Sequence, residues 1–165
     1  MGGWFRIDVA FAEPMCGVPE EVESSSFLGF AGVRSTKIRI YPLETHIAEK
    51  LHAFTLPRKR ANSRVKDIPD IALLASVREI EGAALCLAMD KVFAYRDTHS
   101  VPSLIPDPPV SWAPVYERIT SRDELRWKSM AEVIGAVRQF LEPVLGGTPQ
   151  WWRPDWWQWQ GIQDD

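Results

Sequence analysis

Hydrophobic residues recur at helical spacing in the middle of the chain. Leu43, Ile47, Leu51 and Phe54 predict about three turns of amphipathic helix over residues 43–55. Lys50 breaks the pattern because it falls on the edge of the apolar arc. A lysine there either extends its ammonium into water or faces a cavity that holds an anion. The other polar residues of this helix are expected to point away from the core: Glu44, Thr45, Glu49 and His52.

Apolar and polar residues alternate in two other segments, which predicts two strands, Trp4–Phe11 and Lys37–Tyr41. Residues 13–26 are expected to form a loop, and the proline-rich residues 97–110 an extended connector. Further helices are expected over 67–75, 77–95, 111–120 and 129–141. In the last helix, Ser129 and Glu132 make a capping box, and Pro143 is expected to end the helix.

These elements predict an α+β fold, a small sheet backed by helices with a mainly helical C-terminal half. We expect a single domain over 1–165, with a core at 1–75 and a helical region at 76–165 that ends in a Trp-rich tail. The tail holds five of the eight tryptophans. It either folds back onto an apolar patch or stacks on nucleobases.

Charged residues gather around residues 57–70. Five of the ten residues from Pro57 to Lys66 are basic, although the chain has a formal net charge of −3. Such a loop is either simply solvated or contacts a phosphate-bearing partner. Asp67 then suits the N-cap of the next helix, and Asp70 suits its first turn. Asp8 lies in the middle of a predicted strand, where it either faces a metal site or forms an exposed ion pair.

Composition limits the class of protein. Hydrophobic residues make up 45% and charged residues 25%, as in ordinary globular proteins. No apolar run is long enough to span a bilayer, and a cytoplasmic protein is expected. Cys16 and Cys86 have no metal-ligand spacing.

Three features follow one another in the middle of the chain: the segment Glu49-Lys50-Leu51-His52-Ala53, the basic loop, and Arg64-Val65-Lys66-Asp67 followed by Asp70. This order resembles the nucleotidyltransferases of the AbiEii/AbiGii toxin family, type IV toxin–antitoxin. The resemblance implies Asp8, Lys50 and Asp67 as catalytic residues, with Asp8 as a metal ligand. It also implies that Lys50, Arg64 and Lys66 bind nucleotide phosphates. Mg²⁺, a nucleoside triphosphate, a tRNA-like RNA acceptor and a cognate antitoxin are expected with it.

The family's first motif is a Gly-Ser or Gly-Gly-Thr turn followed by Asp-x-Asp, and it supplies further metal-binding carboxylates. It is expected before Asp8, yet the sequence contains no Asp-x-Asp. We therefore expect this polypeptide alone to be inactive or incomplete in nucleotide transfer. The alternative is a non-catalytic module that binds nucleotide or RNA, or one that an oligomer or a complementing chain completes.

Overall fold

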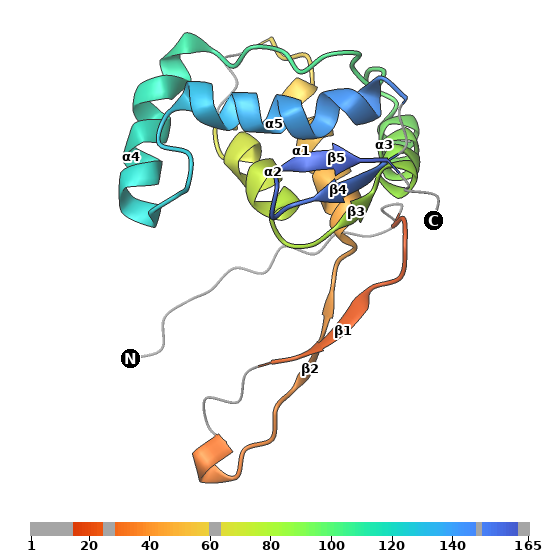
Figure 1. Cartoon of the computed structure of the whole chain (residues 1–165), viewed down its shortest axis with the longest axis vertical. Helices are drawn as coiled ribbons and strands as arrows, with labels where there is room; N and C mark the ends of the chain where they lie inside the picture. The colour runs from red at the N-terminus through yellow and green to blue at the C-terminus, as the bar shows by residue number, and fades with distance from the viewer. Residues whose placement is uncertain (1–14, 25–28, 60–63, 148–149, 162–165) are drawn as a thin grey trace.

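The computed structural model describes residues 15–24, 29–59, 64–147 and 150–161. The predicted strand Trp4–Phe11, which contains Asp8, lies outside the described residues, as do residues 60–63 of the basic loop. The described part forms a helical body with a small sheet, and a two-stranded arm projects from this body (Figure 1). The mixed α+β class predicted from the sequence is confirmed.

The helical body is built around α1 (Leu43–Thr55), whose bounds match the predicted helix. α1 packs on α2 (Asp67–Ala75) and α3 (Gly82–Arg96), and α2 packs on α5 (Met130–Leu145). A short 3₁₀ turn, Val110–Trp112, leads into α4 (Ala113–Asp123). Most of the large, fully buried side chains come from these helices and from the tail, and they include Ile47, Leu51, Ile71, Leu85, Phe140 and Trp152.

Two polar residues of α1 are buried, so the prediction that they point to solvent is wrong. Thr45 is fully buried because its hydroxyl donates to the Cys16 carbonyl (2.8 Å) and accepts from the Cys16 amide (3.0 Å). His52 is buried because its ring packs edge-on against Phe93 of α3, with the ring centroids 4.9 Å apart. Neighbouring elements therefore cover the apolar arc of α1 and also part of its polar face.

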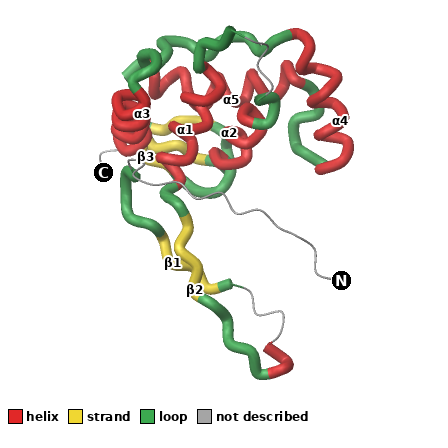
Figure 2. The backbone as a smooth tube through the Cα atoms, turned by 180° about the vertical axis from the view of Figure 1, so that it is seen from behind, coloured by secondary structure: helices red, strands yellow, loops and turns green. Residues whose placement is uncertain are grey.

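The arm is an antiparallel hairpin of β1 (Glu20–Glu23) and β2 (Lys37–Ile40), with Val22 opposite Ile38. A 3₁₀ turn, Gly29–Ala31, lies beyond the strands. The arm extends away from the body in both views (Figures 1 and 2). β1 falls in the segment predicted to be a loop, and every residue of both strands is exposed. The isoleucine face of β2 is therefore solvent-accessible.

The tail builds a second sheet in the order β3–β4–β5, from Ile80–Glu81, Trp151–Arg153 and Gln158–Gln160. The helix predicted from residue 77 begins at Gly82 because residues 80 and 81 pair with β4. Within α3, Leu85 is buried and Leu87 is exposed.

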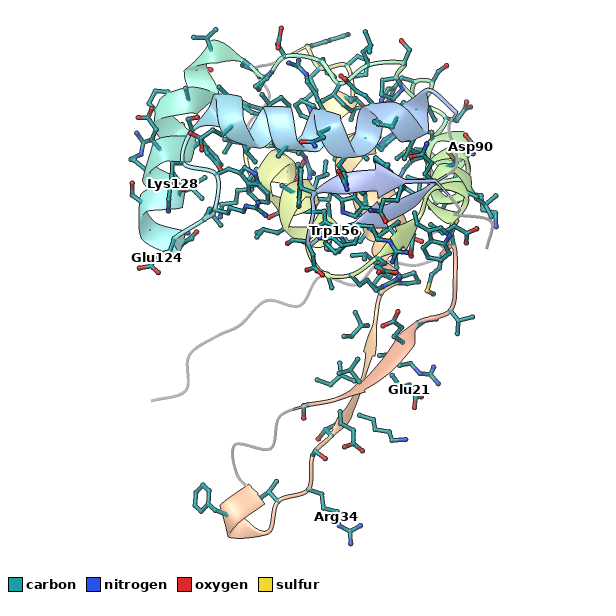
Figure 3. All side chains as sticks on the ribbon, in the orientation of Figure 1. Glu21, Arg34, Asp90, Glu124, Lys128 and Trp156 are labelled. Carbon is teal, nitrogen blue, oxygen red and sulfur yellow. The ribbon has the colours of Figure 1, made fainter. Side chains whose placement is uncertain are left out.

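The tail tryptophans pack onto the body, which confirms the packing role for three of them. The indole N–H of Trp152 donates to Ala75 (2.7 Å), that of Trp157 to Ala136 (3.3 Å) and that of Trp159 to Phe140 (2.8 Å). Each indole thus satisfies a backbone carbonyl while its ring covers apolar surface. Trp156 points outward and is exposed, as Figure 3 shows.

α5 begins as predicted, because Ser129 accepts a hydrogen bond from the Glu132 amide (3.2 Å). The Glu132 carboxylate binds the Lys128 amide (2.7 Å), one residue before the expected partner. Pro143 does not end the helix, which runs to Leu145. A proline in the last turn removes a single backbone donor, and the Gly146 amide still binds the Glu142 carbonyl (2.9 Å).

Candidate phosphate-binding site

The two aspartates at the start of α2 hold the side chain of Lys50. Its ammonium nitrogen lies 2.6 Å from Asp70 Oδ2 and 3.3 Å from Asp67 Oδ1. The Lys50 side chain is 25% exposed and that of Asp67 is 5% exposed. The lysine at the edge of the apolar arc thus meets carboxylates of its own chain.

The local sequence explains this contact. Lys50 lies between the buried residues Ile47 and Leu51 of α1, so its aliphatic stem runs over the core. Asp67 and Asp70 are three residues apart in a helix, which brings both carboxylates to one face of the first turn of α2. Negative charge is favourable at that end of the helix dipole.

Asp67 does not cap α2, so this part of the sequence prediction is wrong. The N-cap position is held by Lys66, and no side chain makes a capping hydrogen bond. Asp67 Oδ1 binds Lys50 instead. The buried Oδ2 has no hydrogen-bond partner among the described residues, and its nearest cation is the Arg64 guanidinium at 3.6 Å.

Lys50 keeps its positive charge at neutral pH. Burial by itself lowers the pKa of Lys50, but the hydrogen bond to Asp70 and the charges of Asp70 and Asp67 outweigh it, so the pKa is raised. The site therefore contains a fixed cation that cannot serve as a general base near pH 7.

Lys50 lies in the wall of a basic pocket of about 280 Å³. Four of the described side chains in the wall are lysine or arginine, and Glu49 supplies a carboxylate. Two histidines also line the pocket, so the basic side chains in its wall are His46, Lys50, His52, Arg58, Arg64 and Arg96. Guanidinium and ammonium groups around one cavity suit the oxygens of phosphate groups.

The two histidines add little charge near neutral pH. Burial, and then the charge of Lys50, lowers the pKa of His46, against an opposing effect of Asp70. Burial, followed by the charges of His99 and Arg96, lowers the pKa of His52. The arginines and Lys50 therefore account for the positive charge of the pocket at pH 7.

The structure brings together some of the residues that the sequence singles out. Lys50 and Asp67 are in contact, and Arg64 lines the pocket. Lys66 is exposed and is not among the described pocket-lining residues. Asp8 lies outside the described residues, so its distance from Lys50 stays a prediction.

Sequence reasoning missed two participants. Asp70 is the closer partner of Lys50, and its spacing from Asp67 was the available signal. Arg96, at the end of α3, reaches the pocket only because α3 packs on α1. No local pattern marks such a residue.

The described residues around Lys50 do not fit a divalent metal site. Within the described ranges, no three His, Cys, Asp or Glu side chains are grouped so that they could hold a metal ion. Asp67 and Asp70, the two carboxylates beside Lys50, already bind its ammonium group. Asp8 stays the predicted metal ligand.

The fold and site define a mixed α+β protein with a basic pocket of about 280 Å³, whose wall includes a lysine held by two carboxylates. In the described part of the chain, no helix has the length and apolar character to cross a membrane. The family model for the nucleotidyl transferase AbiEii toxin of the Type IV toxin–antitoxin system matches residues 4–160, and the chain belongs to this family. The family implies a cognate antitoxin. A comparison with curated proteins gave no match.

Proposed function

We propose that this chain binds the phosphates of a nucleoside triphosphate in the basic pocket, as part of nucleotidyl transfer to an RNA acceptor. The observation that carries the proposal is the position of Lys50. Its ammonium stays charged between two carboxylates, at the wall of a cavity lined by arginines. Phosphoryl chemistry depends on positioning and on stabilisation of charge, and fixed cations supply both.

The described residues have distinct roles in this proposal. Lys50 contacts a phosphate oxygen, while Asp67 and Asp70 hold its ammonium in place. Arg64 contacts both Asp67 and the pocket, so it links the phosphate site to the start of α2. Lys66 and the rest of the basic loop extend positive charge toward an RNA backbone.

Mg²⁺ belongs to the proposal through Asp8 alone. A metal ion in this family's reaction neutralises charge on the phosphates. One carboxylate cannot hold two metal ions, and the sequence contains no Asp-x-Asp. We therefore expect the 165-residue polypeptide to bind nucleotide and RNA but not to transfer nucleotides at an enzymatic rate. A complementing chain or an oligomer could supply the missing carboxylates.

Binding is tested by neutralising two matched sets of cations. Arg58→Gln, Arg64→Gln and Arg96→Gln together remove three positive charges from the pocket. The control replaces three cations of the arm, which lies apart from the body: Arg34→Gln, Lys37→Gln and Arg39→Gln. The pocket variant is expected to bind a labelled triphosphate at least about tenfold more weakly and with a smaller salt dependence. Equal losses in both variants would show that binding is non-specific.

Transfer is tested separately by incubating the polypeptide with Mg²⁺, labelled triphosphates and bulk tRNA. No label should enter the RNA. Incorporation that Lys50→Ala abolishes would overturn the proposed inactivity and show that the polypeptide is a complete enzyme. A polypeptide that binds through the pocket and incorporates no label fits the alternative of a non-catalytic binding module equally well. Adding the missing motif on a second chain and regaining incorporation would then decide for a complemented enzyme.

A further inference from the structure

The tail sheet has one face on the core and one face toward solvent. Trp152 and Trp159 are directly paired across β4 and β5, and both pack against the core. Successive side chains of a strand point to opposite faces, so Arg153 and Gln160 lie on the outer face. Trp156 lies in the turn that joins β4 to β5, where its side chain is 63% exposed (Figure 3).

The exposure of Trp156 follows from the packing of the next residue. Trp157 is buried beside Trp127 and Trp152, with ring centroids 5.1 Å and 5.0 Å away. It adopts φ 50°, a left-handed conformation that is rare for a bulky side chain. The surrounding rings hold Trp157 in this conformation, and the turn then carries Trp156 away from the core.

Trp156 forms part of the wall of a cavity of about 250 Å³ on the outer face of the sheet. The other described lining residues come from the segment before β3 and from the tail itself, and they are Glu79, Arg153, Pro154, Asp155 and Gln160. An exposed indole ring beside polar side chains suits a planar ligand whose face stacks and whose edge forms hydrogen bonds.

Arg153 has a buried donor that lacks an acceptor. Its guanidinium is ion-paired with Glu79, but its Nε–H has no hydrogen-bond partner among the described residues. Leaving a buried donor unpaired costs free energy, so a ligand that supplies an acceptor is favoured here. Glu79 and Asp155 can accept hydrogen bonds from the same ligand, and Gln160 can both donate and accept.

The charges of the lining residues distinguish between classes of ligand. Two carboxylates and one guanidinium give the described wall a formal charge of −1, which does not attract a phosphate group. A lysine or arginine side chain of a partner protein carries only donors, so it would leave the Arg153 Nε–H without an acceptor. An uncharged nucleobase carries donors and acceptors on its edge and stacks through its face.

We propose that this cavity binds an unpaired base of an RNA, stacked on Trp156, an inference that rests on the proposed function for the class of its ligand. Arg153 Nε–H donates to the base, and Asp155 or Glu79 accepts from its N–H groups. Guanine suits the cavity best, because its O6 acceptor adjoins two N–H donors on one edge. The cavity shares no described lining residue with the basic pocket, so it holds the RNA at a second position.

The experiment measures, by fluorescence anisotropy, the affinity of the polypeptide for short labelled single-stranded RNAs of uridine in which one central base is guanine or adenine. Trp156→Ala removes the stacking ring, and Asp155→Asn removes a carboxylate acceptor. Phe30→Ala is the control for the ring, because Phe30 is 89% exposed on the arm. Glu81→Gln is the control for the charge, because Glu81 is exposed and is not among the described lining residues. Circular dichroism verifies that each variant is folded.

The wild-type polypeptide should bind the guanine-containing RNA about fivefold or more tightly than RNA of uridine alone. Trp156→Ala should weaken binding of the guanine-containing RNA about tenfold, as the loss of one stacked base implies. Asp155→Asn should remove the preference for guanine. Phe30→Ala and Glu81→Gln should change neither quantity.

Three results would overturn the inference. The first is that Trp156→Ala binds every RNA as tightly as the wild type does. The second is that free guanosine monophosphate competes as well as the RNA, which indicates a free nucleotide as the ligand. The third is that the NMR signal of 5-fluorotryptophan at Trp156 responds to an arginine-rich peptide and not to RNA, which indicates a protein partner.

The proposed function is tested by a different ligand. Trp156→Ala should leave triphosphate binding unchanged, because Trp156 does not line the basic pocket. A polypeptide that binds no triphosphate would therefore refute the proposed function, whereas the affinities for the RNAs decide this inference.

Discussion

Replacing Lys50 with methionine tests whether the site is a coupled charge cluster or a set of surface contacts. The substitution keeps an apolar stem of similar length over the core but removes the ammonium. Asp67 is 5% exposed, and the cation that then remains near it among the described residues is the Arg64 guanidinium, 3.6 Å away. A buried carboxylate that loses its partner is costly, because its desolvation is no longer offset.

The magnitude follows from the burial of each partner. Removing one member of a fully buried pair costs about 3–5 kcal/mol, and the Arg64 contact lowers the expected loss for Lys50→Met to about 2–3 kcal/mol. Asp67→Asn should cost only about 1 kcal/mol, because the Lys50 ammonium still binds Asp70 at 2.6 Å and the Lys50 side chain is 25% exposed to solvent. The double variant should be more stable than Lys50→Met alone, because no unpaired buried charge remains.

Urea unfolding followed by tryptophan fluorescence measures these differences, with eight tryptophans as the signal. The unfolding midpoints should shift while the slope stays constant. Asp70→Asn serves as a comparison, because that carboxylate is 38% exposed and its loss should cost under about 1 kcal/mol. The reasoning is refuted if Lys50→Met costs no more than Asp67→Asn, or if the double variant shows the sum of the two losses.

Two further predictions concern the neighbouring rings of His52 and His99, and the glycines at the start of α3 and within α5. The pKa of His52 is lowered by burial, then by His99 and Arg96, and that of His99 by burial, from 6.5 in both cases. As the pH falls toward 6.5, the unfolded chain binds protons at these histidines before the folded chain does, so the thermal unfolding midpoint should decrease between about pH 7 and pH 5. His99→Gln should make this decrease of the midpoint with pH smaller. The same decrease in the variant and the wild type would contradict this account. Gly82→Ala should destabilise by about 1–2 kcal/mol, since the new Cβ would lie 3.0 Å from the Gln150 carbonyl oxygen. A Cβ at Gly135 would have no neighbouring atom within 4 Å, so Gly135→Ala should instead stabilise α5 by about 0.5–1 kcal/mol. The explanation is wrong if denaturant unfolding shows that both substitutions change the free energy of unfolding in the same direction.

Local patterns predicted the parts of the fold that depend on neighbours in sequence. The bounds of α1 and the Ser129 cap of α5 follow from spacing and side-chain chemistry within a few residues. The errors arise where distant segments meet. Ile80 belongs to a strand because the tail, some seventy residues later in the sequence, pairs with it. Thr45 is buried because its hydroxyl donates a hydrogen bond to the backbone carbonyl of Cys16, which comes from a distant segment.

The site divides in the same way. Lys50 was conspicuous because a lysine on an apolar edge breaks the helical pattern, and Asp67 stood in the order of residues on which the resemblance to the family rests. The motif did not reveal that Asp70 approaches Lys50 more closely than Asp67 does. The contribution of Arg96 and the hydrogen bonds between Thr98 and the two histidines His52 and His99 depend on the packing of α3 against α1, which no local pattern encodes.

The two aspartates give Lys50 a property that a surface lysine lacks. An ammonium has three N–H donors, and the two carboxylates engage two of them, which leaves one for a phosphate oxygen in the pocket. A free lysine loses rotamer entropy when it binds a ligand, whereas this side chain is already held in one place. The carboxylates also offset its charge, so the arginines must supply most of the net attraction for an anion. In the proposed function, Lys50 would therefore position a phosphate group, and the arginines around it would provide the affinity.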